Sequence, residues 1–474
     1  MPASPVRPDR AAIVSTLAII LVINGGVGWA VFQWGWARAL AEVGLLVYVA
    51  VELPRIARGG RRMLLAGFGA TLAALAFQPD PLHLLAHALA EAAFVVGLFT
   101  SLGMLRDAAH SSDLVQRCGE QMVRQRPSRR YAVLALGSHM ISLVLNFGVL
   151  PLLGVMVAKG NTLDAAGGDP VVLGIRNRRM MTAILRGFAM MTVWSPLSVS
   201  FAVTQEVMHG LPWWHLLPLQ VLLASLLMAL GWFMDRLAFP PQSLRLPPGR
   251  WDTDWRPVIG LCLLVVAVVV GAVALAALLD VRLVIGAMMV VPAAAVVWLL
   301  AQQRDSSPDM LLAALRHFAL RLTVSLPAFR YEVAMLGGAM YLGSIVAAFI
   351  SPEATAAAIA RLPLPPLAVV IVLSWTVMVL AQIGISQIVS VTLLGSACSG
   401  LSTAGIPPLV LASGLMGAWA LSACSTPVGA AVLTVARMAG VPVRTVARDW
   451  NGAFVVVGAL VLGVWMVILS LVLR

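Results

Sequence analysis

Residues 190–204 read MMTVWSPLSVSFAVT, and residues 420–436 read ALSACSTPVGAAVLTVA. In each stretch a hydroxyl side chain followed directly by proline, in Ser195-Pro196 and Thr426-Pro427, interrupts an apolar helical pattern. Proline lacks a backbone donor, so a break within a membrane helix leaves backbone groups that protein, water or a ligand must satisfy. Two such breaks in matching contexts predict a duplicated binding site.

The composition indicates a multi-pass membrane protein. Of the 474 residues 60% are apolar and 11% are charged, and the mean hydropathy is +0.94, which lies outside the range of soluble domains. Apolar segments of about 20 residues recur along the whole chain, which favours spanning helices over the alternating strands of a β-barrel. We expect an all-α polytopic membrane protein with about eleven spanning helices, broken helices and two re-entrant hairpins.

The net charge of +12 reports topology and not nucleic-acid binding, because the basic residues gather in short loops between apolar segments. Such loops are cytoplasmic, so we expect a bacterial inner-membrane protein with a cytoplasmic N-terminus. Helices at 11–32, 38–53, 63–79 and 82–105 place the basic loops at 55–62 and 106–130 inside. A broken helix at 181–208 and a helix at 214–236 place the basic loop at 236–256 inside as well. The four cysteines, Cys118, Cys262, Cys398 and Cys424, form no zinc or disulfide motif and are interpreted as packing residues.

The segment at residues 131–157 has basic residues on both sides, at 106–130 and again at 159–186. Both of its ends are therefore predicted to be cytoplasmic. A re-entrant hairpin satisfies this requirement, and Asn146, Gly148 and Pro151 permit the turn.

The second half of the chain repeats the first. Glu91 and Glu332 lie 241 positions apart, and each is followed by glycine six residues later. Ser142 and Asn146 fall opposite Ser386 and Ser390, 244 positions apart, and the two prolines of the breaks are 231 apart. We predict N-terminal helices at residues 1–80, a first repeat at 81–256, connecting helices with an amphipathic segment at 257–325, and a second repeat at 326–474.

The loop charges orient the two repeats in opposite directions across the membrane. Inverted-topology repeats with broken helices are typical of secondary transporters, which hold the substrate between the breaks near the midplane. This combination argues against an enzyme, and the sequence contains no catalytic constellation.

Each break is expected to start a half-helix, at Pro196 and at Pro427, with the preceding hydroxyl as N-cap. The half-helix N-termini would attract an anion, and the carbonyl groups that end the preceding half-helices would suit Na⁺. Ser198, Ser200, Ser422 and Gly429 lie within one turn of the breaks. The alternative is that each proline only kinks a packed helix.

Glu91 and Glu332 lie in apolar stretches and are candidates for proton coupling, because burying a charged carboxylate in a membrane is costly. The alternative is a structural role near a helix end, with pairing to arginines such as Arg330. His83, His87 and His139 complete no metal-binding pattern.

Residues 414–456, GLMGAWALSACSTPVGAAVLTVARMAGVPVRTVARDWNGAFVV, resemble the C-terminal repeat of the ion transporter superfamily, and residues 194–219, WSPLSVSFAVTQEVMHGLPWWHLLPL, resemble the matching N-terminal segment. That superfamily includes the divalent-anion/sodium symporters and the large membrane subunits of TRAP transporters. The resemblance implies a scaffold domain, a transport domain, and elevator-like transport of organic anions coupled to Na⁺ or H⁺. It implies ion or substrate contacts at Ser195, Ser425, Thr426, Asn146 and Ser390. The Ser-Asn-Thr signature of the divalent-anion symporters is absent, so no dicarboxylate is specified.

We therefore expect a cation-coupled secondary active transporter of a small anionic organic solute, with no cofactor beyond Na⁺ or H⁺. Its binding residues are predicted to be Asn146, Ser195, Pro196, Ser198, Ser390, Ser425, Thr426, Pro427 and Gly429. Candidate partners are the lipid bilayer, a second copy of the chain and a periplasmic binding protein. The alternatives are a membrane-embedded enzyme or assembly component for lipid or envelope precursors, and an exporter of metalloid or drug-like species.

Overall fold

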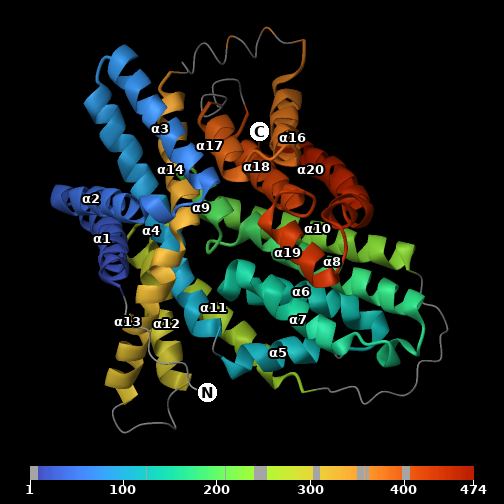
Figure 1. Cartoon of the computed structure of the whole chain (residues 1–474). Helices are drawn as coiled ribbons and strands as arrows, with labels where there is room; N and C mark the ends of the chain where they lie inside the picture. The colour runs from blue at the N-terminus through green and yellow to red at the C-terminus, as the bar shows by residue number, and fades with distance from the viewer. Residues whose placement is uncertain are drawn as a thin grey trace. The chain divides into compact units, whose positions relative to one another are not determined.

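The computed structural model describes residues 9–110, 112–123, 125–208, 210–239, 254–302, 310–349, 357, 361, 363–397 and 406–473. These residues form helices and connecting turns (Figure 1). Most of the basic loop predicted at residues 236–256, part of the connecting segment at 303–309, and Cys398 lie outside the described residues.

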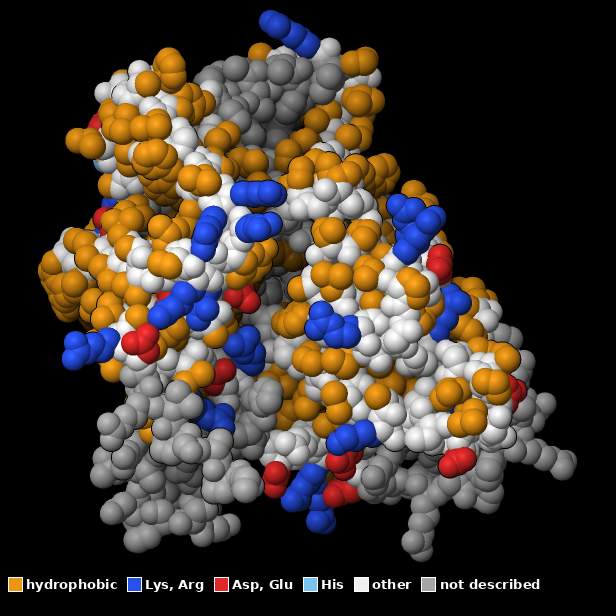
Figure 2. Space-filling view, in the orientation of Figure 1, with side chains coloured by type: hydrophobic (Ala, Val, Ile, Leu, Met, Phe, Trp, Pro, Cys, Tyr) orange, Lys and Arg blue, Asp and Glu red, His pale blue; other side chains and the backbone are white. Residues whose placement is uncertain are grey.

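Eight helical segments of the described residues are long and apolar enough to cross a bilayer. Two of these eight segments, Ser128–Gly160 and Pro170–Val207, each contain two helices separated by a break. The chain is thus an all-helical, multi-pass membrane protein, and hydrophobic side chains cover much of the surface visible in Figure 2. Fewer spans qualify than the sequence led us to expect. The helices α2 (Gly35–Glu52) and α3 (Arg58–Phe77) each carry three charged residues, and the helices Pro366–Gln382 and Pro408–Ala423 are shorter than 18 residues.

The helices of the first half follow in a simple order. They are α1 (Arg10–Phe32), α2, α3, α4 (Pro81–His110), α5 (Asp113–Val123), α6 (Pro127–Leu145), α7 (Val149–Gly160), α8 (Pro170–Trp194), α9 (Val199–Val207) and α10 (Trp213–Ala238). Short 3₁₀ turns lie at Leu53–Arg55, Asn146–Gly148 and Asp164–Ala166.

The second half runs through the same order. Its described helices are α11 (Arg256–Leu278), α12 (Leu283–Gln302), α13 (Met310–Ala328), α14 (Arg330–Ala347), α16 (Pro366–Gln382), α17 (Gln387–Ala397), α18 (Pro408–Ala423), α19 (Ala430–Ala439) and α20 (Gly452–Val472), with a π-helical turn at Thr445–Trp450. In chain order, α16–α20 follow one another as α6–α10 do, with an interrupted helix pair, a broken helix and a final long helix in each half.

The chain divides into two compact units. Unit 1 comprises Met1–Ser111 and Ala267–Ser351, and unit 2 comprises Ser112–Val266 and Pro352–Arg474. Each predicted repeat contributes to both units. The boundaries after residues 111 and 351 are 240 positions apart, close to the spacing of Glu91 and Glu332. The predicted division into repeats describes the order of the chain and stays a prediction.

Within unit 2 corresponding helices pack in corresponding ways (Figure 1). Helix α6 packs on α8 as α16 packs on α18, and α10 packs on α8 as α20 packs on α18. Between the two halves, α8 contacts α18, α7 contacts α19, and α17 contacts α9. These contacts have the reciprocity that an internal two-fold relation produces.

Unit 1 is built on close helix contacts at small residues. A Cβ atom added to Gly25 of α1 would lie 2.5 Å from the Ala37 carbonyl oxygen and 2.7 Å from the Ala41 nitrogen of α2. One added to Gly44 of α2 would lie 2.7 Å from the Ala18 oxygen of α1. Membrane helices associate through such small residues because lipid supplies no hydrophobic force between them.

We predict that Gly25→Ala destabilises the protein by about 1–3 kcal/mol, because the new methyl group meets backbone atoms that cannot move aside. Thermal unfolding of the purified protein in detergent measures the change. The matched control is Gly69→Ala in α3, where an added Cβ meets nothing within 4 Å. An unchanged midpoint for Gly25→Ala would contradict the close α1–α2 contact.

Candidate functional site

The first break is a tight turn between α8 and α9, and hydroxyl groups hold it closed. The Ser195 Oγ accepts a hydrogen bond from the Leu197 backbone nitrogen at 3.1 Å. The Ser198 Oγ donates to the Ser195 carbonyl at 2.7 Å and accepts from the Phe201 nitrogen at 3.2 Å. Both serines are buried, and so is Pro196.

The second break, between α18 and α19, is held mainly by backbone and amide groups. The nitrogens of Ser425 and Thr426 both donate to the Ser422 carbonyl, at 3.0 and 2.9 Å, and the Thr426 Oγ1 donates to the same oxygen at 2.6 Å. Ser425 and Thr426 are buried, whereas the next apolar residue, Val428, is 60% exposed. The N-terminus of α19 is therefore more accessible than that of α9.

The half-helices begin three residues later than predicted. Ser198 is the N-cap of α9, which starts at Val199, and Gly429 precedes α19, which starts at Ala430. Pro196 and Pro427 thus lie in the turns and not at the first helical positions. The reason at the first break is that the Ser195 hydroxyl closes a local turn with Leu197 before Ser198 caps the helix.

Unit 2 contains both breaks, and the helices that flank them pack on one another. Helices α8 and α18, which lead into the breaks, contact one another. The half-helix after each break contacts the helix that precedes the other break, α9 with α18 and α19 with α8. Two segments separated by more than 200 residues therefore share one packed core, as the predicted duplicated site requires.

A helix pair interrupted by a turn lies beside each break. The first turn follows Leu145, and Asn146 has a positive φ of 48°. The second follows Gln382, where Gly384 has a φ of 94°. The alignment of the two repeats by sequence paired Asn146 with Ser390. In the structure the residue with positive φ in the second turn, and hence the equivalent of Asn146, is Gly384. Ser390 lies one turn into α17, is buried, and donates to the Ser386 carbonyl at 3.3 Å.

The second helix pair reaches the second break through two glutamines that the sequence analysis missed. The Gln382 Nε2 donates to the Ser425 Oγ at 2.8 Å, and the Gln387 Nε2 donates to the Ser422 Oγ at 3.3 Å. An added Cβ on Gly384 would touch Val428 at 3.5 Å. Gln382 and Gln387 lie two residues before and three residues after Gly384, which forms the turn. Two glutamines this close to a turn glycine in an apolar segment could have been identified from the sequence as candidate site residues.

Buried hydroxyls line the contact between α9 and α17. Within the part of the chain that the structure describes, Ser200, Thr204 and Thr392 have buried hydroxyl oxygens without a hydrogen-bond partner. Ser200 and Thr204 lie on the face of α9 that also carries Val207, which packs against Gly395 of α17. Thr392 is one turn before Gly395. In the corresponding contact of α7 with α19, Gly154 meets the side chain of Met438.

Arg186 lies inside α8 and not in the basic loop to which the sequence assigned it. Helix α8 already begins at Pro170, where the Asp169 side chain caps it, so the arginines from residue 176 onward are helical. The buried Arg186 guanidinium donates to the Asn451 Oδ1 and the Trp450 carbonyl, both at 3.0 Å, and lies over the Phe454 ring. It ties α8 to the start of α20.

The two glutamates belong to unit 1 and differ in their surroundings. Glu91 lies within α4, is largely buried, accepts a hydrogen bond from Ser344, and lies 3.5 Å from the His87 Nδ1. Glu332 lies in the first turn of α14 and is partly exposed. Unit 1 also buries a carboxylate that the sequence analysis missed, Glu52, which accepts from Ser15 at 2.7 Å and pairs with Arg330 at 3.0 Å.

Among the described residues no group of three or more His, Cys, Asp or Glu side chains could hold a metal ion. The His139 ring bonds at both nitrogens, with Nδ1 3.2 Å from the Gly187 carbonyl and Nε2 accepting from the Trp194 Nε1 at 2.9 Å. Because a carbonyl can only accept, the bonds assign the neutral Nδ1–H tautomer. His139 is thus a structural link between α6 and the end of α8.

The fold is similar to those of two solved transporters. One is the YdaH transporter of Alcanivorax borkumensis, with a TM-score of 0.49 and 14% identity over 78% of this chain and 84% of that chain. The other is MtrF of Neisseria gonorrhoeae, described among antimetabolite efflux pumps, with a TM-score of 0.48 and 11% identity over 93% of this chain and 96% of that chain. No protein-family model matches the chain, and no curated protein matches it.

We predict that His139→Ala lowers stability by about 1–3 kcal/mol, because the Gly187 carbonyl within α8 and the Trp194 indole at its end lose a hydrogen-bond partner. The thermal unfolding midpoint measures this loss. His83→Ala, at an exposed position near the start of α4, is the control and leaves the midpoint unchanged. Equal thermal unfolding midpoints for His139→Ala and His83→Ala would contradict a stabilising role of His139.

Proposed function

We propose that the chain is a secondary active transporter of a small anionic organic solute, which it binds between the two helix breaks of unit 2. The observation that carries the proposal is the reciprocal packing of α8, α9, α18 and α19 around the breaks. A proline break that only kinks a helix does not require a second break in the same packed core.

The half-helix N-termini support an anionic solute. The N-terminal N–H groups of a helix have no partner within the helix and carry a partial positive charge. At α19 the N-cap is Gly429, which has no side chain to accept from these groups, and the adjacent Val428 is exposed. An anion can therefore bind there without a Lys or Arg side chain in the hydrocarbon region.

The hydroxyls of Ser200, Thr204 and Thr392 support a coupling cation or a polar part of the solute in the same unit. Buried hydroxyls without partners are costly, so they gain most from a ligand. A polar ligand at the contact of α9 with α17 would therefore gain hydrogen bonds from these three hydroxyls.

The division into two compact units supports elevator-like alternating access. Unit 2 holds both breaks and both interrupted helix pairs and is proposed as the transport domain, with unit 1 as the scaffold. The boundaries lie at equivalent points of the two halves, so each repeat would carry a hinge at the same place. Membership of the ion transporter superfamily, symport, and an inner-membrane location with a cytoplasmic N-terminus belong to this proposal. A second copy of the chain and a periplasmic binding protein remain proposed partners.

We predict that the double variant Ser195→Ala, Thr426→Ala loses transport by roughly tenfold or more, since hydrogen bonds around a charged ligand each contribute about 1.5–3 kcal/mol. A thermal-shift screen with succinate, citrate and benzoate, each with Na⁺ or choline, first identifies a bound acid. Uptake of that labelled acid into proteoliposomes then measures transport.

The matched control is Ser225→Ala, Thr376→Ala, which removes two exposed hydroxyls that bond within their own helices in unit 2. Both double variants must retain wild-type gel-filtration profiles. Unchanged transport by Ser195→Ala, Thr426→Ala would exclude the breaks as the binding site.

Proton coupling is proposed at Glu91, with Glu332 as the second candidate, because Glu91 is the more buried and lies beside His87. We predict that Glu91→Gln makes transport insensitive to an imposed pH gradient, since the amide cannot take up the coupling proton. Proteoliposomes with inside and outside pH set separately measure the response. Glu120→Gln, at an exposed site of α5, keeps the wild-type response, and a retained response in Glu91→Gln would favour Na⁺ coupling.

A further inference from the structure

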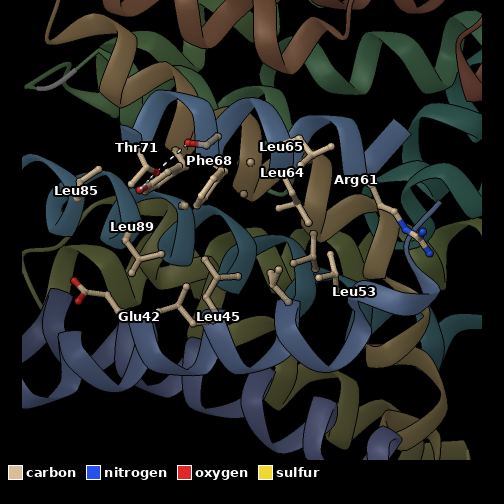
Figure 3. Close-up of a pocket in the computed structure, with 18 of the residues that line it drawn as sticks. Glu42, Leu45, Leu53, Arg61, Leu64, Leu65, Phe68, Thr71, Leu85 and Leu89 are labelled. Carbon is tan, nitrogen blue, oxygen red and sulfur yellow. Dashed lines mark hydrogen bonds between the residues drawn. The ribbon is translucent and has the colours of Figure 1, made fainter. Parts of the chain in front are cut away.

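Unit 1 contains an apolar cavity of about 950 Å³ between α2, α3, α4 and α14 (Figure 3). Its walls are mainly leucine and phenylalanine side chains, among them Leu45 and Leu46 of α2, Leu64, Leu65 and Phe68 of α3, and Leu89 of α4. Leu46, Leu65 and Phe68 are each more than half exposed, so the cavity is an open groove between α2 and α3.

The interior of the groove has few polar groups, and they are paired. The Thr71 and Tyr341 hydroxyls lie 2.9 Å apart in a hydrogen bond (Figure 3). A polar ligand or a chain of water molecules would find little to bond with along these walls. The groove therefore suits a hydrocarbon chain.

The two ends of the groove differ in charge. Glu42 lines one end and Arg61 lines the other, as Figure 3 shows. Arg38 neutralises Glu42 at 2.7 Å. The Arg61 Nη2 donates to the Pro54 carbonyl at 2.6 Å.

The Arg61 end carries a cluster of exposed positive charge. Arg55 pairs with Asp9 and Glu52. Arg58, Arg61 and Arg62 have no carboxylate partner among the described residues and are exposed. Exposed guanidinium groups next to a membrane segment attract the phosphates of anionic lipids, and each can bind phosphate oxygens with two parallel hydrogen bonds.

The length of the groove matches one leaflet of a bilayer. From Arg61 to Thr71 the α3 helix rises about 15 Å, which is half of the hydrocarbon thickness of about 30 Å. We propose that the groove binds an acyl chain of an anionic glycerophospholipid, with the lipid phosphate at Arg61. The basic loop would set this lipid in the cytoplasmic leaflet. This site lies in unit 1 and does not depend on the proposed transport site.

Native mass spectrometry of the purified full-length protein, delipidated and then titrated with phosphatidylglycerol or phosphatidylcholine of identical acyl chains, tests the proposal. We expect one tightly retained phosphatidylglycerol per chain. Arg61→Gln weakens its binding about fivefold and weakens phosphatidylcholine less, because the choline cation of phosphatidylcholine offsets the charge of its phosphate. Leu46→Trp fills the groove and weakens both lipids.

Two matched variants serve as controls. Arg444→Gln removes an exposed arginine of unit 2, and Leu40→Trp adds the same bulk to α2 outside the groove. Leu65→Trp on the opposite wall replaces Leu46→Trp if the latter lowers the unfolding midpoint. Equal retention of phosphatidylglycerol by wild type and Arg61→Gln would overturn the proposal. A changed oligomeric mass of Leu46→Trp with unchanged lipid retention would also overturn it, and would make the groove a subunit interface.

Discussion

The satisfaction of backbone polar groups in a medium without water is the constraint on which the rest of this structure depends. A continuous helix meets it automatically, but a broken one does not. At the first break the side-chain hydroxyls of Ser195 and Ser198 form hydrogen bonds with backbone groups of the turn. At the second break the Ser422 carbonyl accepts two backbone donors and one hydroxyl. Both breaks can exist only because unit 2 encloses them with other helices.

The repeated order of helices explains how one chain encloses two breaks. Each half supplies an interrupted helix pair and a broken helix, and the halves exchange contacts reciprocally. The side chains at these contacts differ, because Gly395 of α17 meets Val207 of α9 near three unpartnered hydroxyls, whereas Gly154 of α7 meets Met438 of α19. A duplicated framework with different side chains at equivalent positions is suited to binding two different ligands.

Unit 1 satisfies its polar groups differently. It buries the carboxylate of Glu52 between Ser15 and Arg330, and it joins α1 to α2 through glycines. Because removing one partner of a buried ion pair is strongly destabilising, the Glu52–Arg330 pair holds α2 to the start of α14. Between α2 and α3 the unit leaves an open leucine-lined groove, which is favourable only where hydrocarbon fills it.

The sequence alone determined the membrane class, the positions of both breaks, the turn near Asn146 and much of the duplication, because hydropathy, proline and glycine act locally along the chain. It assigned Arg186 to a loop, and it missed Gln382, Gln387 and Glu52. Only the tertiary structure decided these, because the partners of a buried polar group come from helices far away in the sequence.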